Sequence, residues 1–309
     1  MKVIGVQQYG RADALAVIER PEPHPGPGEV RLRVEYAGVN PVDAMVRRGD
    51  LADWFGDVEP PFVPGMDVVG VVDEIGADAT AWPAIGDRVI AVVDNFGGYG
   101  AYSQFVVVPA ASAVSPPAGA SGPEAGSFLM NALTALTAVD ALPGIAGGRR
   151  VLVTGAAGAV GANAVALAAR SGFDVTALAS ATDTNLLLGL GAARALGSAD
   201  ELDVRFDAVI DTAGAASDLI DSVRDGGAVV VVQPDVPEFD RGITVTHVNV
   251  RDRITDTPAL AELVELTTAG VLPLRVAGVF PASNAAAAHD KLAERGTRGR
   301  YVLDFTSID

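Results

Sequence analysis

The sequence predicts an α/β protein of two domains, one built on a doubly wound parallel sheet and one on an antiparallel, barrel-like sheet. The chain has 309 residues, which is more than one hydrophobic core usually spans. Residues 29–109 hold short β-branched segments separated by Gly and Pro, whereas residues 149–234 alternate strand-like with helix-like segments. We therefore expect a first domain of residues 1–120 and 272–309, and a second domain of residues 121–271.

Charge and composition argue against several classes of partner. The 22 Lys and Arg stand against 39 Asp and Glu, and the resulting net charge of −17 repels nucleic-acid phosphates and anionic membrane surfaces. With no cysteine and three histidines far apart in the sequence, we expect no metal site. The first residues lack a signal-peptide pattern, and no uncharged apolar run approaches the roughly 18 residues of a membrane span. We expect a cytoplasmic protein that acts on a small molecule.

Strand candidates in the first domain are short and joined by turns, which favours antiparallel pairing. A break rich in Gly and Pro at 116–123 precedes a long helix expected over 124–142, so a domain boundary is expected near residue 120. Near the end of the chain we expect a strand, a helix with Pro281 in its first turn, and a closing strand, all belonging to the first domain. The expected strands are 29–38, 67–76, 87–93, 102–109, 274–280 and 299–305.

The second domain alternates strand and helix, which predicts parallel strands joined by right-handed crossovers. The apolar run at 229–232 suits either an edge strand that pairs two copies of the chain or a buried central strand. Strands are expected at 149–155, 173–180, 206–214 and 226–234, with helices at 159–172, at 184–192 and between the last two strands.

A glycine-rich turn joins the first of these strands directly to its helix. In VLVTGAAGAVG (151–161), Gly155 permits a tight turn, Gly158 lets the backbone approach a pyrophosphate, and Gly161 allows close packing of helix on strand. The unpaired N–H groups of the helix N-terminus favour anionic oxygens. This context predicts dinucleotide binding, although a packing turn in any doubly wound sheet is the plainer alternative.

Two other nucleotide-binding motifs do not match. A mononucleotide P-loop requires Gly-Lys-Ser/Thr, but Gly161 is followed by Ala162-Asn163. The short-chain dehydrogenases place their glycine motif near the N-terminus and use Tyr-x-x-x-Lys, and none of the five tyrosines has a Lys four residues on.

The choice of coenzyme is predicted from the end of the second parallel strand, where NAD-binding proteins carry an acid for the ribose hydroxyls. This strand ends Ala177-Leu178-Ala179-Ser180, without an acid, and Ser180 and Thr182 can donate to a 2′-phosphate. Asp183 opposes that phosphate. We expect NADPH, with NADH as the alternative.

Further stretches accompany the glycine turn along nearly the whole chain, including AGVNPVDAMVRRG (37–49), PFVPGMDVVGVVDEIG (61–76), GGYGAYSQFVVVP (97–109), DTAG (211–214) and RYVLDF (300–305). With them the chain resembles the zinc-free medium-chain dehydrogenase/reductases, in their quinone oxidoreductase (zeta-crystallin-like) branch. Zinc-dependent relatives carry a metal-binding Cys at the position of Asn40 and a His at that of Met66.

The resemblance implies a GroES-like catalytic domain, a Rossmann domain, a homodimer, and hydride transfer from a nicotinamide to a quinone or α,β-unsaturated carbonyl. It places Asn40 beside the nicotinamide ribose and Thr134 beside the nicotinamide. The predicted coenzyme contacts are Asn40, Thr134, Gly155, Ala157, Gly158, Ala159, Val160, Gly161, Ser180, Thr182, Ala213, Gly214, Gln233 and Arg300.

Hydride addition to an enone or quinone spreads charge over an enolate, which hydrogen-bond donors stabilise and protonate. The resemblance makes Asn40 a predicted catalytic residue, and Tyr99 is the candidate proton donor; from the residues alone, cap or turn formation by Asn40 and packing by Tyr99 are the plainer roles. Asp43 is expected to be a capping or ion-pair partner. A cofactor-binding redox sensor and a cofactor-assisted, non-redox step on a specialised metabolite are the alternative functions.

Overall fold

The structure, a computed structural model, describes residues 1–78, 82–97, 99–142, 150–234, 236–294 and 296–308. It contains two compact units, and each is described by itself. Unit 1 comprises Met1–Met130, Arg251–Thr268 and Leu274–Asp309, and unit 2 comprises Asn131–Val250 and Ala269–Pro273. The domain limits expected at residues 120 and 272 stay predictions.

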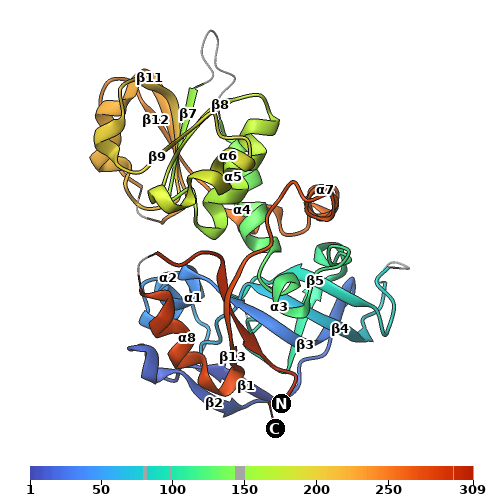
Figure 1. Cartoon of the computed structure of the whole chain (residues 1–309). Coiled ribbons are helices and arrows are strands. Elements are labelled where there is room, and N and C mark those ends of the chain that lie inside the picture. The colour runs from blue at the N-terminus through green and yellow to red at the C-terminus, as the bar shows by residue number, and fades with distance from the viewer. Residues whose placement is uncertain (79–81, 98, 143–149, 235, 295, 309) are drawn as a thin grey trace. The chain divides into compact units, whose positions relative to one another are not determined.

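The main sheet of unit 1 is largely antiparallel and has the strand order β13-β14-β3-β4-β5, with β6 pairing with β3 (Figure 1). Its longest strand, β3, pairs antiparallel with β4, β6 and β14, whereas β13 and β14 are parallel. A separate hairpin joins β1 (Lys2–Gly5) and β2 (Ala16–Glu19). The strands of the main sheet are β3 (Glu29–Val39), β4 (Asp67–Ile75), β5 (Arg88–Val92), β6 (Phe105–Pro109), β13 (Val276–Pro281) and β14 (Arg300–Asp304).

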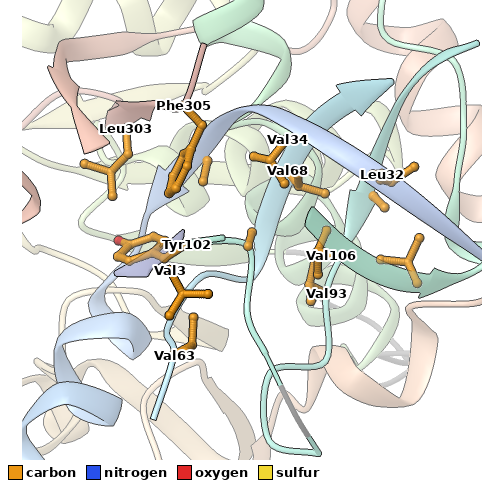
Figure 2. Packing of buried hydrophobic residues seen from close by; sticks show 14 of the residues in the cluster. Val3, Leu32, Val34, Val63, Val68, Val93, Tyr102, Val106, Leu303 and Phe305 are labelled. Carbon is orange, nitrogen blue, oxygen red and sulfur yellow. The ribbon is translucent and has the colours of Figure 1, made fainter. Parts of the chain in front are cut away.

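Alternating apolar residues build the core of unit 1. Val30, Leu32 and Val34 of β3 are all buried and lie on one face of the pleated strand, as a period of two residues requires. Figure 2 shows Tyr102 among these apolar side chains, close to Val3. The C-terminal Leu303 and Phe305 belong to the same cluster, so the core joins residues from both ends of the chain.

The segment expected to form a long helix after residue 123 begins in unit 1 and continues into unit 2. The single helix expected over 124–142 is wrong, because the chain forms α3 (Gly122–Ala125) and α4 (Leu129–Asp140) with a turn between them. A Cβ on Gly126 in that turn would lie 2.9 Å from the backbone oxygen of Tyr36, so contact with β3 determines the break. Pro281 is the last residue of β13 and also the N-cap residue of the 3₁₀ helix Ala282–Asn284, which leads directly into α8, so the expected helix begins one residue after Pro281. The remaining helices of unit 1 are α1 (Pro41–Arg48), α2 (Ala52–Phe55), α7 (Thr257–Thr268) and α8 (Ala285–Leu292).

A second apolar cluster of unit 1 is rich in aromatic rings. Phe55 lies 5.0 Å from both Phe62 and Phe96, measured between ring centroids. The guanidinium of Arg251 lies 4.8 Å from the centroid of Phe96 and donates to both carboxylate oxygens of Asp94, at 3.0 and 2.9 Å. Arg251 therefore fastens the start of the segment Arg251–Thr268 to the loop after β5.

Unit 2 has a six-stranded sheet in the order β12-β11-β10-β7-β8-β9, and every one of its pairings is parallel. This is the doubly wound order, so the predicted Rossmann sheet is confirmed. Figure 1 shows α5 (Ala159–Arg170) and α6 (Thr184–Gly189) beside this sheet. The strands are β7 (Arg150–Thr154), β8 (Asp174–Leu178), β9 (Arg194–Leu196), β10 (Phe206–Asp211), β11 (Val223–Val231) and β12 (Thr244–His247).

The apolar run at 229–232 was compatible with an edge strand or with a central strand, and in the structure it belongs to a central strand. β11 lies between β10 and β12, and β12 is the edge strand.

The helix expected before β11 is a 3₁₀ helix, Ala216–Ser222. The other 3₁₀ helices are Ala12–Ala14, Ala110–Ser112, Ala181–Asp183, Ala199–Glu201, Val250–Arg253 and Ala282–Asn284. Among the described residues, no helix combines the length and the apolar character that a bilayer crossing requires.

Candidate functional site

The glycine-rich turn of unit 2 connects β7 directly to α5. β7 ends at Thr154, Gly155 has a φ of +57°, and the N–H of Gly158 donates to the carbonyl oxygen of Gly155 at 2.8 Å. A Cβ on Gly161 would lie only 2.3 Å from that same oxygen. Glycine is therefore required at both ends of the turn, at Gly155 for its positive φ and at Gly161 for close packing.

The middle of the turn is sterically open where α5 begins. Gly158 is the N-cap residue of α5, and a Cβ built on it would meet one neighbour, the oxygen of Gly155, at 3.1 Å. The first turn of a helix presents backbone N–H groups without intrahelical acceptors, and these groups attract anions. Ala157, Ala159 and Val160 lie in this segment, so the residues present fit a coenzyme pyrophosphate.

Several predicted coenzyme contacts come together beside this turn. A Cβ on Gly155 would lie 3.2 Å from the Cβ of Ala213, and one on Gly214 would lie 4.0 Å from the Cγ of Gln233. These residues follow the neighbouring strands β7, β10 and β11. Strand order reverses between β7 and β10, and ligands of open α/β sheets bind at such points, outside the carboxyl ends of the strands.

The loop after β8 carries the residues predicted to choose the coenzyme. The hydroxyls of Ser180 and Thr182 are exposed and lie 3.0 Å apart. Asp183, expected to oppose a 2′-phosphate, is buried with 8% of its surface exposed. The acid is thus turned away from solvent while both hydroxyls remain accessible.

In unit 1, Asn40 lies in a buried polar cluster with the two carboxylates Asp43 and Asp67, and the half-buried Arg300 interacts electrostatically with both acids. The side-chain amide of Asn40 donates to Asp67 at 3.2 Å, and its backbone N–H donates to Asp43 at 2.7 Å. Asp43 also accepts from the backbone N–H of Gly65 at 2.8 Å, and Asp67 accepts from that of Met130 at 2.8 Å. Asn40 therefore directs its amide to Asp67, while Asp43 caps α1.

Burial shapes the charges of this cluster. It raises the pKa of Asp43 to about 7 and that of Asp67 to about 6, although backbone hydrogen bonds to each favour the ionised form. It also lowers the pKa of Arg300 to about 10, against the attraction of Asp67 and Asp43. Two carboxylates that share one guanidinium can thus retain a proton close to neutral pH.

Tyr99 and Tyr102, two of the tyrosines of unit 1, have different surroundings. The hydroxyl of Tyr99, the predicted proton donor, accepts from Nε of Arg20 at 2.8 Å, and its ring packs against the main core. Tyr102 is fully buried, with its hydroxyl 3.5 Å from Asp43 and 3.2 Å from Nε2 of His289. Burial lowers the pKa of His289 to about 3, so this imidazole is neutral.

Sequence reasoning missed two buried acids. Asp67 opens β4, and Asp211 ends β10, where it is 2% exposed and accepts hydrogen bonds from the following loop. An acid at the first or last position of an apolar strand was the available signal for both. Thr134 lies in α4 and is 7% exposed. In the described part of the chain, no three His, Cys, Asp or Glu side chains gather as metal ligands would.

Comparisons with known proteins cover most of the chain. The family model of the alcohol dehydrogenase GroES-like domain matches residues 26–118, and that of zinc-binding dehydrogenases matches residues 190–303. The chain is 31% identical over 254 residues to a chloroplast envelope quinone oxidoreductase homolog of Arabidopsis thaliana, covering 79% of this chain and 75% of that protein.

Two further comparisons extend over nearly the whole length. A mitochondrial NAD(P)H oxidoreductase of Mus musculus is 28% identical over 351 aligned positions, which cover 97% of this chain and 88% of that protein. The solved structure of a mycobacterial protein complexed with NADPH is 27% identical and covers 98% of this chain and 100% of the other, with a TM-score of 0.84. The chain therefore belongs to the medium-chain dehydrogenase/reductase superfamily, in its quinone oxidoreductase branch.

Proposed function

We propose that this protein is an NAD(P)H-dependent reductase that transfers hydride to a quinone or an α,β-unsaturated carbonyl without a metal ion. The observation that carries the proposal is the glycine turn between β7 and α5, at the point where strand order reverses in a parallel sheet. The names of relatives in the same branch, a quinone oxidoreductase homolog and an NAD(P)H oxidoreductase, agree with it.

The bound dinucleotide would supply the hydride. Gly158 and the N-terminus of α5 would bind the pyrophosphate, and Ala213, Gly214 and Gln233 would hold the nicotinamide half. We further propose that Asn40, kept in one orientation by Asp67, contacts the nicotinamide ribose, and that Thr134 lies beside the nicotinamide.

Proton delivery to the enolate is assigned to Tyr99 in this proposal. Its hydroxyl accepts from Arg20, which leaves its own O–H free to donate, and the guanidinium stabilises negative charge that forms on the phenol oxygen. Replacing Tyr99 with Phe should lower kcat and leave the Kd for coenzyme unchanged. Equal kcat in the variant and the wild type would remove Tyr99 from the mechanism.

The proposed coenzyme is NADPH rather than NADH. The exposed hydroxyls of Ser180 and Thr182, together with the burial of Asp183, favour a 2′-phosphate beyond β8. The NADPH complex of the mycobacterial relative supports the same choice. The double variant Ser180→Ala, Thr182→Ala should bind NADPH more weakly while its affinity for NADH stays the same.

One experiment tests the reaction. The absorbance of NADPH and of NADH is followed with 1,4-quinones and with small enones, beside a titration of coenzyme binding. Coenzyme oxidation that depends on the acceptor supports the reductase. Binding without turnover would indicate a redox sensor, and conversion of an acceptor without net coenzyme oxidation would indicate a non-redox step.

We also propose a cytoplasmic homodimer that forms through β12. This strand is the edge of the unit 2 sheet, so two copies pairing there would extend one continuous sheet. Light scattering on the purified protein measures the mass directly, and a monomer at micromolar concentration would contradict the proposal.

A further inference from the structure

The carboxylate of Asp211 at the end of β10 is surrounded by hydrogen-bond donors. It accepts from the hydroxyl of Thr154 at 2.5 Å and from the backbone N–H groups of Ala213, Ala215 and Ala216 at 3.1, 3.1 and 2.8 Å. The side chain is buried, since the residue is 2% exposed. Burial of a carboxylate is costly unless donors satisfy it, and here four do.

The same bonds join two turns that lie side by side. Thr154 ends β7, which pairs with β10, and its hydroxyl accepts from the backbone N–H of Thr212 at 3.2 Å. In return the hydroxyl of Thr212 donates to the backbone oxygen of Thr154 at 2.7 Å. The loop after β10 is thus held against the start of the glycine turn by reciprocal contacts.

Beyond Thr212 the loop is built of alanine and glycine, whose side chains form no hydrogen bonds. Residues 212–216 read Thr-Ala-Gly-Ala-Ala, and Gly214 has a φ of +71°. Asp211 draws the N–H groups of Ala213 and Ala215 inward, while Ala213 and Gly214 remain exposed. The carboxylate therefore determines the conformation of the peptide that is exposed.

We propose that Asp211 is a positioning residue for the nicotinamide half of the coenzyme, acting through the Ala213–Gly214 segment that it orients. The inference rests on the proposed function and adds to it a residue that would touch neither coenzyme nor substrate. If Asp211 has this role, the binding of the nicotinamide half depends on Asp211, whereas the binding of the adenine half does not.

The substitution Asp211→Asn tests this with little change in shape. Three donors converge on one oxygen of Asp211 and the N–H of Ala216 points at the other. An amide offers one acceptor oxygen, so its NH₂ group would face a donor in either orientation. The loop must then rearrange.

Asp207→Asn is the matched control. Asp207 belongs to the same strand, is 6% exposed, and accepts from the backbone N–H of Arg150 at 2.8 Å, but it lies at the amino end of β10, away from the loop. Asp207→Asn should therefore lower the stability of the sheet without a selective effect on coenzyme binding.

Calorimetric titration with two probes separates positioning from general damage. NADPH contains both halves of the coenzyme, and adenosine 2′,5′-bisphosphate contains the adenine half alone. Asp211→Asn should weaken NADPH at least tenfold and change the affinity for the bisphosphate less than twofold, whereas Asp207→Asn should leave both affinities within twofold. Unchanged NADPH affinity, or an equal loss for the two probes, overturns the inference. Wild-type protein that binds neither probe instead refutes the proposed function.

A second pair of variants applies if Asp211→Asn does not fold. Thr154→Val removes the hydroxyl that bonds Asp211 and Thr212 while keeping the shape, and Thr154→Ser keeps the hydroxyl. The Val variant should lose NADPH affinity selectively and the Ser variant should retain it. Equal affinities in the two variants would contradict a positioning role.

Discussion

Alanine substitutions at two glycines of the same turn should affect coenzyme binding and folding to different extents. For Gly158→Ala, the added Cβ meets one atom, at 3.1 Å, and a φ of −74° suits alanine. The cost to folding is then the loss of a good N-cap residue, about 1 kcal/mol or less. The Cβ would occupy the position that a pyrophosphate approaches, so the Kd for NADPH should rise at least tenfold, about 1.4 kcal/mol.

Gly161→Ala should instead act mainly on folding. Its Cβ would lie 2.3 Å from the oxygen of Gly155 and 2.8 Å from the Cα of Ala156, both backbone atoms that cannot rotate away. Overpacking of this kind costs about 1–3 kcal/mol, and the better helix propensity of alanine offsets at most about 1 kcal/mol. We expect a clear fall in the free energy of unfolding.

The assay pairs urea unfolding with titration of NADPH for each variant. Gly189→Ala serves as the control, because Gly189 lies in α6 and a Cβ there meets nothing within 4 Å. It should leave affinity unchanged and stability equal or slightly higher. Wild-type affinity in Gly158→Ala would refute the placement of the pyrophosphate, and wild-type stability in Gly161→Ala would refute the packing argument.

Three further predictions concern unit 1, each read out by urea unfolding. Because burial raises the pKa of Asp43 from 3.8 to about 7, its folded carboxyl keeps a proton that the unfolded one loses, and the resulting stability disappears as pH rises through about 7. The stability of the wild type relative to Asp43→Asn should thus fall by up to about 4 kcal/mol between about pH 4 and pH 8, while a constant difference would contradict the burial argument. The titration of His289 changes stability in the opposite direction, but the wild type and Asp43→Asn both contain His289, so this effect cancels in the comparison. Leu303→Ala, at a fully buried site, should cost about 2–5 kcal/mol, and a loss below about 1 kcal/mol would mean that the core closes around the gap. Arg251→Lys keeps the charge but loses the paired bonds to Asp94, and should cost about 1–2 kcal/mol at low and high salt alike; a loss that salt abolishes would indicate simple charge attraction.

The fold could be predicted because its signals are local. The turn from Gly155 to Gly161 lies within seven residues, and the alternation of strand and helix around it follows from periodicity alone. The break in the expected helix over 124–142 could not be predicted, since it depends on how closely Gly126 approaches Tyr36 on a distant strand. In this segment a tertiary contact overrides the helix propensity of the sequence.

The polar groups were harder to predict than the backbone. Asp67 accepts hydrogen bonds from Asn40 and Met130, residues separated from it by 27 and 63 positions, and no spacing rule connects them. Tyr99 and Tyr102 are three residues apart and looked alike in sequence, yet one bonds Arg20 and the other lies within the core. Which hydroxyl reaches which partner depends on side-chain packing across the sheet, so the roles proposed for Asn40 and Tyr99 stay predictions.

The position of β14 has a consequence for synthesis on the ribosome. This strand lies far from β3 in the sequence but inserts between β13 and β3, so unit 1 has an open edge along β3 until β14 has been synthesised. Unit 2 is nearly continuous in sequence and can condense earlier. A nascent chain stalled before residue 300 would expose strand backbone of β3 to other polypeptides, so the need for chaperones should be greatest before β14 has been synthesised.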